Sequence, residues 1–365
     1  MNVGCNRSAL SEALGIVGGV VALRTPKPVL ECVRFCAEKD SVVLLGTDLE
    51  VGIRYVLSQV TVSQPGEILV PADKLAAVVR ESGDEVLEIA SIEQGCQVIG
   101  ADSRFDLYGQ DPAEFPPVPR MEGQPDMTIK AGVLERMIHR TVFAAARENT
   151  RYAINGVLWE KQGKTLVMVA TDGRRLARTE GQAEMAADGH GEAIVPVKTM
   201  GLIGRLLNDP DELVSVRMMS NQILVSTGRA TVSSVLVEGR FPKYEDVIPR
   251  DNDKVISFGI GVLSSAVRRA ALMTTEDSKG VRFNFRDGHL ELSGRSAGRG
   301  EAVIRLSVEY KGVPIEIGFN PVYLLDGLKV VGADAVELAL SEPNKPGMIR
   351  SSDGFLCVIM PVSLS

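Results

Sequence analysis

The sequence contains no long apolar run, and this absence argues against a membrane-spanning helix. A span needs roughly 18 or more consecutive apolar residues, and no such stretch occurs in the chain. The segment Met1 to Arg7 also lacks a basic stretch followed by an apolar one, so a secretory signal is not predicted. We therefore expect a cytoplasmic protein. With 365 residues the chain is too long for one ordinary core, and two or three domains are expected.

Cysteine is scarce, and its distribution argues against a disulfide framework. The five cysteines are odd in number and scattered: Cys5, Cys32, Cys36, Cys96 and Cys357. Cys32 and Cys36 lie four residues apart in a β-branched segment, so they could share one face of a sheet. No second cysteine or histidine pair accompanies them, and buried strand thiols are therefore favoured over a metal site.

Histidine is scarcer still, and no set of acid, base, nucleophile or metal groups converges as an enzyme requires. The three histidines, His139, His190 and His289, have no partners at metal-ligand spacing, and a phosphate-binding loop is absent. Gly294 to Gly298 matches G-x-S-x-G, but the strand pattern Glu301 to Leu306 follows it, with no later histidine. A nucleophile elbow needs a helix after the serine and a later histidine, so a hairpin loop is predicted. No enzyme activity and no cofactor or metal are expected.

The chain has no excess of basic residues, yet its charge is unevenly distributed. The net charge is −7, which by itself disfavours nucleic acid as a partner. Residues 1–120 carry 10 Lys and Arg against 17 Asp and Glu, whereas residues 121–248 carry 16 of each sign and residues 249–365 carry 14 of each. The acidic excess thus lies in the first third, and an acidic protein can still hold a basic inner surface.

One long unit occurs three times in the sequence. A strand that runs into a helix reads Ile68 to Leu75 and recurs as Ala193 to Met200, 125 residues later. It recurs again as Ile317 to Leu324, a further 124 residues on. The segment Gly46 to Leu49 matches Ala170 to Gly173 at an offset of 124. Because these offsets agree, the chain is predicted to contain three copies of one structural unit.

Each copy is predicted to have the same α+β architecture, with two helices packed on an antiparallel sheet. A helix comes first, over Arg7–Val20, Ala131–Arg147 and Val262–Met273. A second, shorter helix follows Pro71, Pro196 and Asn320. The proline-rich stretch Pro112 to Pro125 and the segment Pro249 to Asp253 are the linker candidates. The expected domains are therefore residues 1–120, 121–248 and 249–365.

Several segments, in order along the chain, resemble the bacterial DNA polymerase III beta subunit family. Arg151 to Leu158 reads R-Y-A-I-N-G-V-L, Ala170 to Ala177 reads A-T-D-G-R-R-L-A, and the tail Val358 to Val362 reads V-I-M-P-V. The resemblance implies three clamp domains in a head-to-tail homodimeric ring. Such a ring encircles double-stranded DNA without sequence preference and tethers the replicative polymerase for processive synthesis. It also implies a nucleoid-associated protein with no cofactor and no membrane partner.

Basic residues on the predicted helices could form the DNA-facing surface of such a ring. The first helix of the second copy and the residues after it carry Lys130, Arg136 and Arg140, although a solvated charged face explains this pattern equally well. A loop with Arg24 and Lys27 matches a loop that touches DNA in the family. The DNA-binding candidates are Arg24, Lys27, Arg147, Arg151, Tyr152, Lys198 and Arg205. Contacts to phosphates would be independent of sequence and sensitive to salt.

The resemblance also implies a pocket for the clamp-binding peptides of partners, namely the clamp loader, the replicative DNA polymerase and other proteins with that motif. The matching positions, called the candidate pocket below, are Ile154, Thr171, Gly173, Arg175, Leu176, Pro242, Val247, Asn320, Tyr323, Val358, Met360 and Pro361. Methionine and proline near a chain end suit an adaptable apolar groove. Ordinary domain core is the alternative. Asp246 stands where the family commonly has arginine.

For the dimer interface, the resemblance implies two hydrophobic pairs, Phe105 with Leu107 in the first domain and Leu272 with Met273 in the third. Two other protein classes remain open at this point. One is an enzyme of nucleic-acid metabolism, which the missing acid–base and metal sets disfavour. The other is a repeat scaffold that binds only proteins. Retention on circular DNA that is lost when the circle is cut would distinguish a clamp from both.

Overall fold

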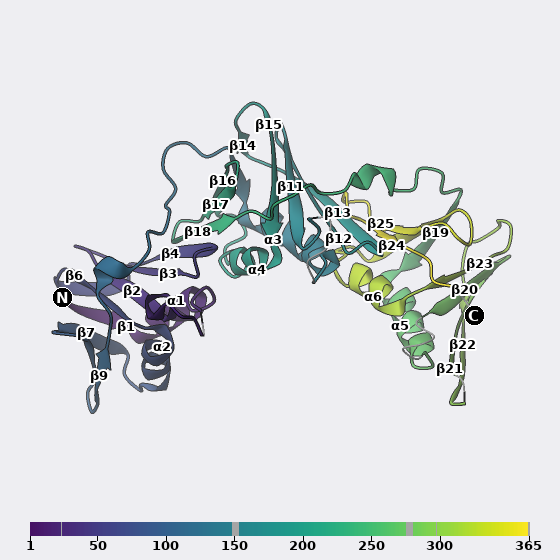
Figure 1. Ribbon diagram of the computed structural model, residues 1–365. Helices are drawn as coiled ribbons and strands as arrows, with labels where there is room; N and C mark the ends of the chain where they lie inside the picture. The colour runs from purple at the N-terminus through teal and green to yellow at the C-terminus, as the bar shows by residue number, and fades with distance from the viewer. Residues whose placement is uncertain (23, 148–152, 275–279, 297, 364–365) are drawn as a thin grey trace. The chain divides into compact units, whose positions relative to one another are not determined.

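The computed structural model describes residues 1–22, 24–147, 153–274, 280–296 and 298–363. A strand, a helix, a group of four or five strands, a second helix and three further strands follow one another three times in it (Figure 1). Each copy opens with a short strand that leads directly into a helix, and the sequence analysis missed this strand. The opening pairs are β1 (Asn2–Asn6) with α1 (Arg7–Val17), β10 (Met127–Lys130) with α3 (Ala131–Thr141), and β19 (Lys254–Gly259) with α5 (Ile260–Ala271). The second helices, as predicted, are α2 (Ala72–Glu81), α4 (Val197–Gly204) and α6 (Pro321–Lys329).

The ends of the first helices differ from the predicted ones for local reasons. The side chain of Asn6 accepts a hydrogen bond from the Ala9 amide at 3.0 Å and caps the start of α1. This helix ends at Val17, three residues early, because the glycine pair that begins at Gly18 follows it. Helix α3 ends at Thr141 and continues as the 3₁₀ turn η3 (Val142–Ala144) rather than reaching Arg147. Helix α5 begins two residues early, at Ile260.

The chain divides into two compact units, of which the first comprises residues 1–135, 183–189 and 198–236. Helices α1 and α2 pack against each other in it (Figure 1). Its five-stranded sheet has the order β5 (Val60–Gln64), β1, β7 (Val86–Ile92), β8 (Gly95–Ile99) and β9 (Arg104–Tyr108). Its nine-stranded sheet has the order β14 (Met185–Ala186), β10, β16 (Leu213–Met218), β17 (Gln222–Ser226), β18 (Ala230–Val235), β4 (Val51–Leu57), β3 (Val42–Thr47), β2 (Cys32–Ala37) and β6 (Gly66–Pro71). The 3₁₀ turns η1 (Pro28–Glu31) and η2 (Pro112–Glu114) complete this unit.

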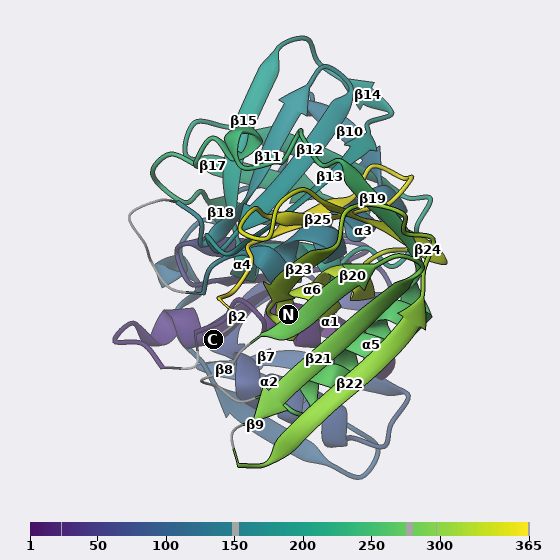
Figure 2. The same cartoon turned by 90° about the vertical axis from the view of Figure 1, so that its right-hand side faces the viewer.

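The second unit comprises residues 136–182, 190–197 and 237–365. Its eight-stranded sheet has the order β15 (His190–Pro196), β11 (Gly156–Gln162), β12 (Thr165–Thr171), β13 (Arg175–Gln182), β26 (Leu356–Ile359), β25 (Gly347–Arg350), β24 (Ala335–Leu340) and β19. Its four-stranded sheet has the order β22 (Gly300–Ser307), β21 (His289–Ser296), β20 (Val281–Arg286) and β23 (Ile315–Phe319). Helix α5 packs on the face formed by β21 and β22 (Figure 2). The 3₁₀ turn η4 (Tyr244–Asp246) precedes the second linker.

Two strand pairings join one copy of the repeat to the next, and we call them the interior joints. In the first unit β18 pairs with β4 in antiparallel register, from Ala230 opposite Tyr55 to Ser234 opposite Val51. In the second unit β13 pairs with β26, so that strands of the second and third copies share one sheet. The middle copy therefore divides between the two compact units. Among the described residues, the outer strands with a neighbour on one side only are β5 and β9, β14 and β6, β15 and β19, and β22 and β23.

The strand assignments also bear on two motifs that the sequence analysis considered. Cys32 and Cys36 both lie on β2 and pack on one small hydrophobic cluster with Phe115 and Val118, as expected of strand thiols. The G-x-S-x-G segment lies where β21 ends and β22 begins, so the predicted hairpin is confirmed. No group of three or more metal-ligating side chains occurs in the part of the chain that the structure describes. No helix within the same ranges is long and apolar enough to cross a membrane.

Candidate functional site

The candidate pocket is built around a tight turn between β12 and β13, which we call the Thr-Asp turn. The Thr171 hydroxyl donates a hydrogen bond to the Arg175 carbonyl at 2.7 Å and accepts one from the Gly173 amide at 3.1 Å. The Asp172 carboxylate accepts hydrogen bonds from the amides of Arg174 and Arg175, both at 3.0 Å. These side-chain bonds replace the strand ladder where the chain reverses. Gly173 has φ +83°, a conformation that glycine adopts without steric cost.

The first copy of the repeat contains the same turn, so the matched segments Gly46 to Leu49 and Ala170 to Gly173 are alike, although the sequence pattern indicated a strand there. The Thr47 hydroxyl donates to the Val51 carbonyl at 2.9 Å, and the Asp48 carboxylate accepts from the Val51 amide at 2.7 Å. The position of Gly173 is taken here by Leu49, at φ +81°. Leu49 is the sole non-glycine residue with positive φ among those described. The first copy therefore keeps the turn even though Leu49 adopts a backbone conformation that costs about 1–2 kcal/mol.

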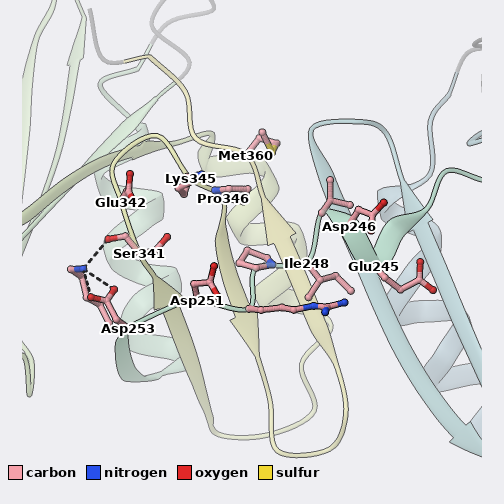
Figure 3. A pocket seen from close by; sticks show the side chains of 14 residues that line it. Glu245, Asp246, Ile248, Asp251, Asp253, Ser341, Glu342, Lys345, Pro346 and Met360 are labelled. Carbon is pink, nitrogen blue, oxygen red and sulfur yellow. Dashed lines mark hydrogen bonds and ion pairs between the residues drawn. The ribbon is translucent and has the colours of Figure 1, made fainter.

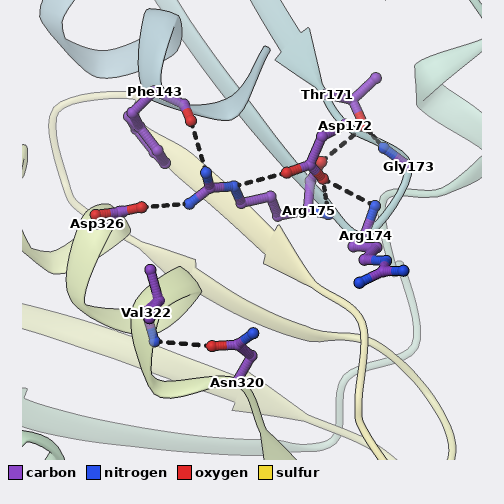
Figure 4. A network of polar contacts seen from close by, with 9 residues as sticks. All are labelled: Phe143, Thr171, Asp172, Gly173, Arg174, Arg175, Asn320, Val322 and Asp326. Atoms are coloured by element: carbon purple, nitrogen blue, oxygen red, sulfur yellow. Dashed lines mark hydrogen bonds and ion pairs between the residues drawn. The ribbon is translucent and has the colours of Figure 1, made fainter. Parts of the chain in front are cut away.

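Arg175, directly after the turn, lies at the centre of a polar network that links several elements (Figure 4). Its guanidinium donates to Asp172 at 3.1 Å, to Asp326 on α6 at 2.5 Å and to the Phe143 carbonyl in η3 at 2.7 Å. The same group lies 4.6 Å from the centre of the Tyr323 ring and 5.3 Å from that of the Phe143 ring. Because the side chain is only 11% exposed, its polar head serves this network and not a ligand.

The remaining candidate pocket residues divide into buried and exposed groups. Ile154, Thr171, Leu176 and Val358 are all less than a tenth exposed. Leu176 and Val358 belong to a core cluster with Leu158 and Val169, so the core interpretation accounts for their position here. Val247 and Met360 are 49% and 41% exposed. Gly173 is exposed, whereas Arg175, Pro242, Asn320, Tyr323 and Pro361 are half-buried. Asn320 also caps α6, since its side chain accepts from the Val322 amide at 2.9 Å (Figure 4).

An open hollow of about 850 Å³ adjoins the exposed end of the candidate pocket, and Val247 and Met360 belong to its lining. Glu245 and Asp246 lie on one side of it, and Glu342 lies on the other (Figure 3). The ammonium of Lys254 is bonded within this lining, to Asp253 at 2.8 Å and to the Ser341 carbonyl at 2.8 Å. The hydrogen bond from Lys254 lowers the pKa of Asp253. The lining of the hollow thus combines the apolar side chains of Val247 and Met360 with charged ones such as Glu245 and Asp246.

Comparisons with known proteins identify the family. Models of the N-terminal, central and C-terminal domains of the DNA polymerase III beta subunit match residues 1–119, 128–243 and 245–363. The chain belongs to the DNA polymerase III beta subunit family. It is 37% identical to the beta sliding clamp of Pseudomonas aeruginosa, over the whole of both chains, and 32% identical to that of Vibrio cholerae, over 98% of both.

Solved structures of the family share the fold over the whole chain. The crystal structure of the DNA polymerase III beta subunit from Pseudomonas aeruginosa has a TM-score of 0.93 at 36% identity, and each chain is covered completely. The sliding clamp from Bacillus subtilis has a TM-score of 0.95 at 26% identity, again over both whole chains. The predicted three-domain α+β clamp fold is thereby confirmed. As a member of this family the chain is a processivity clamp and not an enzyme.

The DNA-binding candidates of this beta subunit lie in different environments. Arg24, Lys27 and Arg147 are exposed, and none has an ion pair among the described residues. Lys198 is 53% exposed and pairs with Asp48, which lies in the matching turn of the first copy, between β3 and β4. Arg205 donates to the Gly15 carbonyl of α1 at 2.7 Å. Arg151 and Tyr152 lie outside the described residues. The candidate cations without an ion pair among the described residues are therefore on loops. Lys198 on α4 and Arg205 just after it instead bond to the first copy of the repeat.

The basic face predicted on α3 needs a correction at Arg140. This side chain is only 2% exposed, so it cannot belong to a solvated basic surface. Its guanidinium is bonded to Asp353 and to the Val330 carbonyl at 3.4 Å, and it lies 5.5 Å from the centre of the Phe355 ring. Arg140 thus ties the second copy of the repeat to the third. Its helical spacing from the exposed Arg136 gave no indication of this, because the partners are distant in sequence.

The interface candidates are all at least partly accessible in the single chain. Phe105 on β9 is 43% exposed, and Leu272, directly after α5, is 76% exposed. Leu107 and Met273 are half-buried. Phe105 and Leu272 are thus open to contact with another molecule, as are other exposed apolar side chains such as Tyr108 and Val313. Sequence reasoning missed two carboxylates that pair with candidate residues, because a single carboxylate carries no motif of its own. Asp326 bonds to Arg175, and Asp48 pairs with Lys198.

Proposed function

We propose that the protein forms a head-to-tail homodimeric ring that encircles double-stranded DNA and tethers the replicative polymerase to it. The observation that carries this proposal is the pattern of sheet edges. Within the chain, each interior joint continues a sheet from one copy of the repeat into the next. The five-stranded and four-stranded sheets each end in two outer strands, β5 and β9 in the first and β22 and β23 in the second. Of these we take β9, which carries Phe105 and Leu107, and β22, which packs on α5, as the edges of the interface. Pairing these two edges between protomers would repeat the interior joint and close the ring.

The proposed interface places Phe105 and Leu107 of one protomer against Leu272 and Met273 of its partner. Exposed edge strands pair readily with other chains, and the apolar side chains beside both edges favour that contact. The domains of the ring are residues 1–120, 121–248 and 249–365. Phe115 supports the first boundary, because it is buried in the cluster of the first copy at 5% exposure.

The proposed DNA contacts are electrostatic and made by Arg24, Lys27, Arg147, Arg151, Tyr152, Lys198 and Arg205. Arg24, Lys27 and Arg147, which are exposed and have no ion pair among the described residues, suit contact with phosphates, and such contact carries no sequence preference. The acidic remainder of the molecule would repel nucleic acid outside the ring. A clamp that surrounds chromosomal DNA would be cytoplasmic and associated with the nucleoid.

The proposed partner site is the candidate pocket, which would take the clamp-binding peptides of the clamp loader, the replicative polymerase and other partners. Its exposed end, at Val247 and Met360, is apolar and hollowed, as an anchoring side chain requires. Met360→Lys should weaken binding of a peptide from the cognate polymerase by tenfold or more, on the order of one hot-spot side chain. The control is Met185→Lys, since Met185 is 60% exposed in the other unit. Equal affinity of both variants would refute the pocket.

The test of encirclement compares the protein loaded on a nicked circle with the same sample after the circle is cut. At high salt we expect retention on the circle and rapid loss from linear DNA, because escape from a circle requires the ring to open. A variant with Arg24, Arg147, Arg151 and Lys198 changed to Ala should load less efficiently, with a flatter salt dependence, but remain on the circle once loaded. Equally rapid loss of the unaltered protein from both substrates would overturn the clamp. It would favour a scaffold that binds only proteins.

A further inference from the structure

The network around Arg175 contains one carboxylate with no assigned role, Asp326 on α6. Its Oδ2 accepts the Arg175 Nη1 hydrogen bond at 2.5 Å, and its side chain is 37% exposed. Tyr323 lies three residues earlier on the same helix, a spacing that places both side chains on one face. The Tyr323 ring stacks on the guanidinium at 4.6 Å. Helix α6 thus holds Arg175 by its edge through Asp326 (Figure 4). It also contacts the face of the guanidinium through Tyr323.

The other contacts of Arg175 fix the plane of its guanidinium. Nε donates to Asp172 at 3.1 Å and Nη2 donates to the Phe143 carbonyl at 2.7 Å. A planar group with three directed hydrogen bonds cannot rotate without breaking one of them. The Tyr323 ring is stacked on that plane, so its orientation depends on the same bonds. Asp326 is the one among these partners that lies on the helix of Tyr323.

We propose that Asp326 is a positioning residue of the candidate pocket, which through Arg175 fixes the Tyr323 ring in the orientation that a partner peptide meets. The proposal rests on the peptide-binding function proposed above. Asp326 need not touch the peptide. Loss of the Asp326 charge removes one hydrogen-bond acceptor from the guanidinium, so that Tyr323 can occupy other rotamers. The peptide then binds only the fraction of molecules whose Tyr323 is in the rotamer that the pocket requires. Such a loss of preorganisation weakens affinity without removing a contact.

The experiment is a double-mutant cycle on the full-length protein, with a fluorescein-labelled peptide from the clamp-binding segment of the cognate polymerase as the probe. Asp326→Asn keeps the shape of the side chain and removes its charge. We expect it to weaken peptide binding roughly five- to tenfold. In the Tyr323→Ala background the same change should have no effect, because the ring that it positions is gone. The matched control is Asp334→Asn, since Asp334 is exposed in the same unit and has no side-chain ion pair among the described residues.

A role in general stability would give a different result, and the cycle distinguishes the two. If Asp326 merely stabilises the fold, its effect on affinity would add to that of Tyr323→Ala, and additive losses would overturn the proposal. Unchanged affinity of Asp326→Asn would overturn it equally. Arg175→Met removes the charged partner of Asp326 and provides a second background, in which Asp326→Asn should again be without effect. If the unaltered protein binds no peptide, the proposed pocket fails and this inference fails with it.

Discussion

Removing Asp353 should destabilise the protein more than removing its partner Arg140. Arg140 is 2% exposed, whereas the Asp353 side chain is 43% exposed. Asp353→Ala leaves a buried guanidinium with the Val330 carbonyl, at 3.4 Å, as its remaining acceptor in the network described. Breaking a buried pair from one side costs roughly 3–5 kcal/mol. Because water reaches the Asp353 side, we expect a smaller loss of about 2 kcal/mol.

Arg140→Met removes the buried charge itself and keeps a long side chain over Phe355. It loses the stacking on that ring, worth roughly 0.5–1 kcal/mol, and one hydrogen bond to Val330, but nothing charged remains buried. We expect a loss of about 1 kcal/mol. Once Arg140 is gone, Asp353→Ala should cost almost nothing more, because the exposed carboxylate has no buried partner to neutralise.

The assay is urea unfolding followed by the emission of Trp159, the single tryptophan, which is fully buried in the unit that contains both residues. At an m-value of roughly 3 kcal/mol per molar urea, a loss of 2 kcal/mol lowers the midpoint by about 0.7 M. A larger loss for Arg140→Met than for Asp353→Ala would refute the reasoning, as would additive losses in the double variant.

The pH dependence of stability provides a second measurement on the same pair. Burial raises the pKa of Asp353, but hydrogen bonds from Arg140 and Ser351 outweigh this and leave the pKa below its ordinary value. A depressed carboxyl pKa contributes stability above the unfolded pKa of about 4, and this contribution is lost as the pH falls through the folded pKa. Arg140→Met should therefore reduce the loss of stability as the pH falls below about 4. An unchanged acid profile would count against the pair.

Three further outcomes follow from the structure. Gly173 has φ +83°, so Gly173→Ala should destabilise its unit by about 1 kcal/mol. Leu49→Gly should instead stabilise the other unit by up to about 1 kcal/mol. Thermal unfolding of each variant will show whether the two changes in stability have opposite signs. Leu272→Asp should sediment as a monomer that still binds peptide, because a dimer would bury the new carboxylate in the proposed interface. A variant that remains a dimer would show that the interface is misplaced. Burial raises the thiol pKa of Cys36 to about 11 and that of Cys5 to about 12, so alkylation of the native protein at pH 8 should be slow. It should reach the half-buried Cys36 before Cys5, and peptide mass mapping would reveal the opposite order.

The sequence predicted the features of the fold that depend on local chemistry. The match between the segments at Thr47 and Thr171 predicted like structure in two copies, and both form the same turn, in which amides just after the threonine and aspartate donate to their side chains. Proline or asparagine before the second helices marked their starts correctly. The opening strands escaped notice because β10, for example, is four residues long and depends on its neighbours in the sheet.

Contacts between distant segments were beyond the reach of local patterns. Arg140 was placed on a basic surface because helical spacing groups it with Arg136, yet its partner Asp353 lies 213 residues away. Arg175 was assigned to the pocket by resemblance, and its partner Asp326 lies 151 residues away. Which of two similar arginines is buried depends on what the fold places opposite each one, and composition and periodicity carry no information on that choice.

The interior joints also determine how this protein can be cut into fragments. A piece limited to residues 121–248 would lose β4 from one of its sheets and β26 from the other, and would expose β18 and β13 along their backbone edges. Bare edges of this kind recruit other strands, so such a piece should aggregate instead of folding as an independent module. A fragment for ligand screening against the peptide site should therefore retain the chain through β26, and the open side of β18 should be protected by a charged or proline substitution.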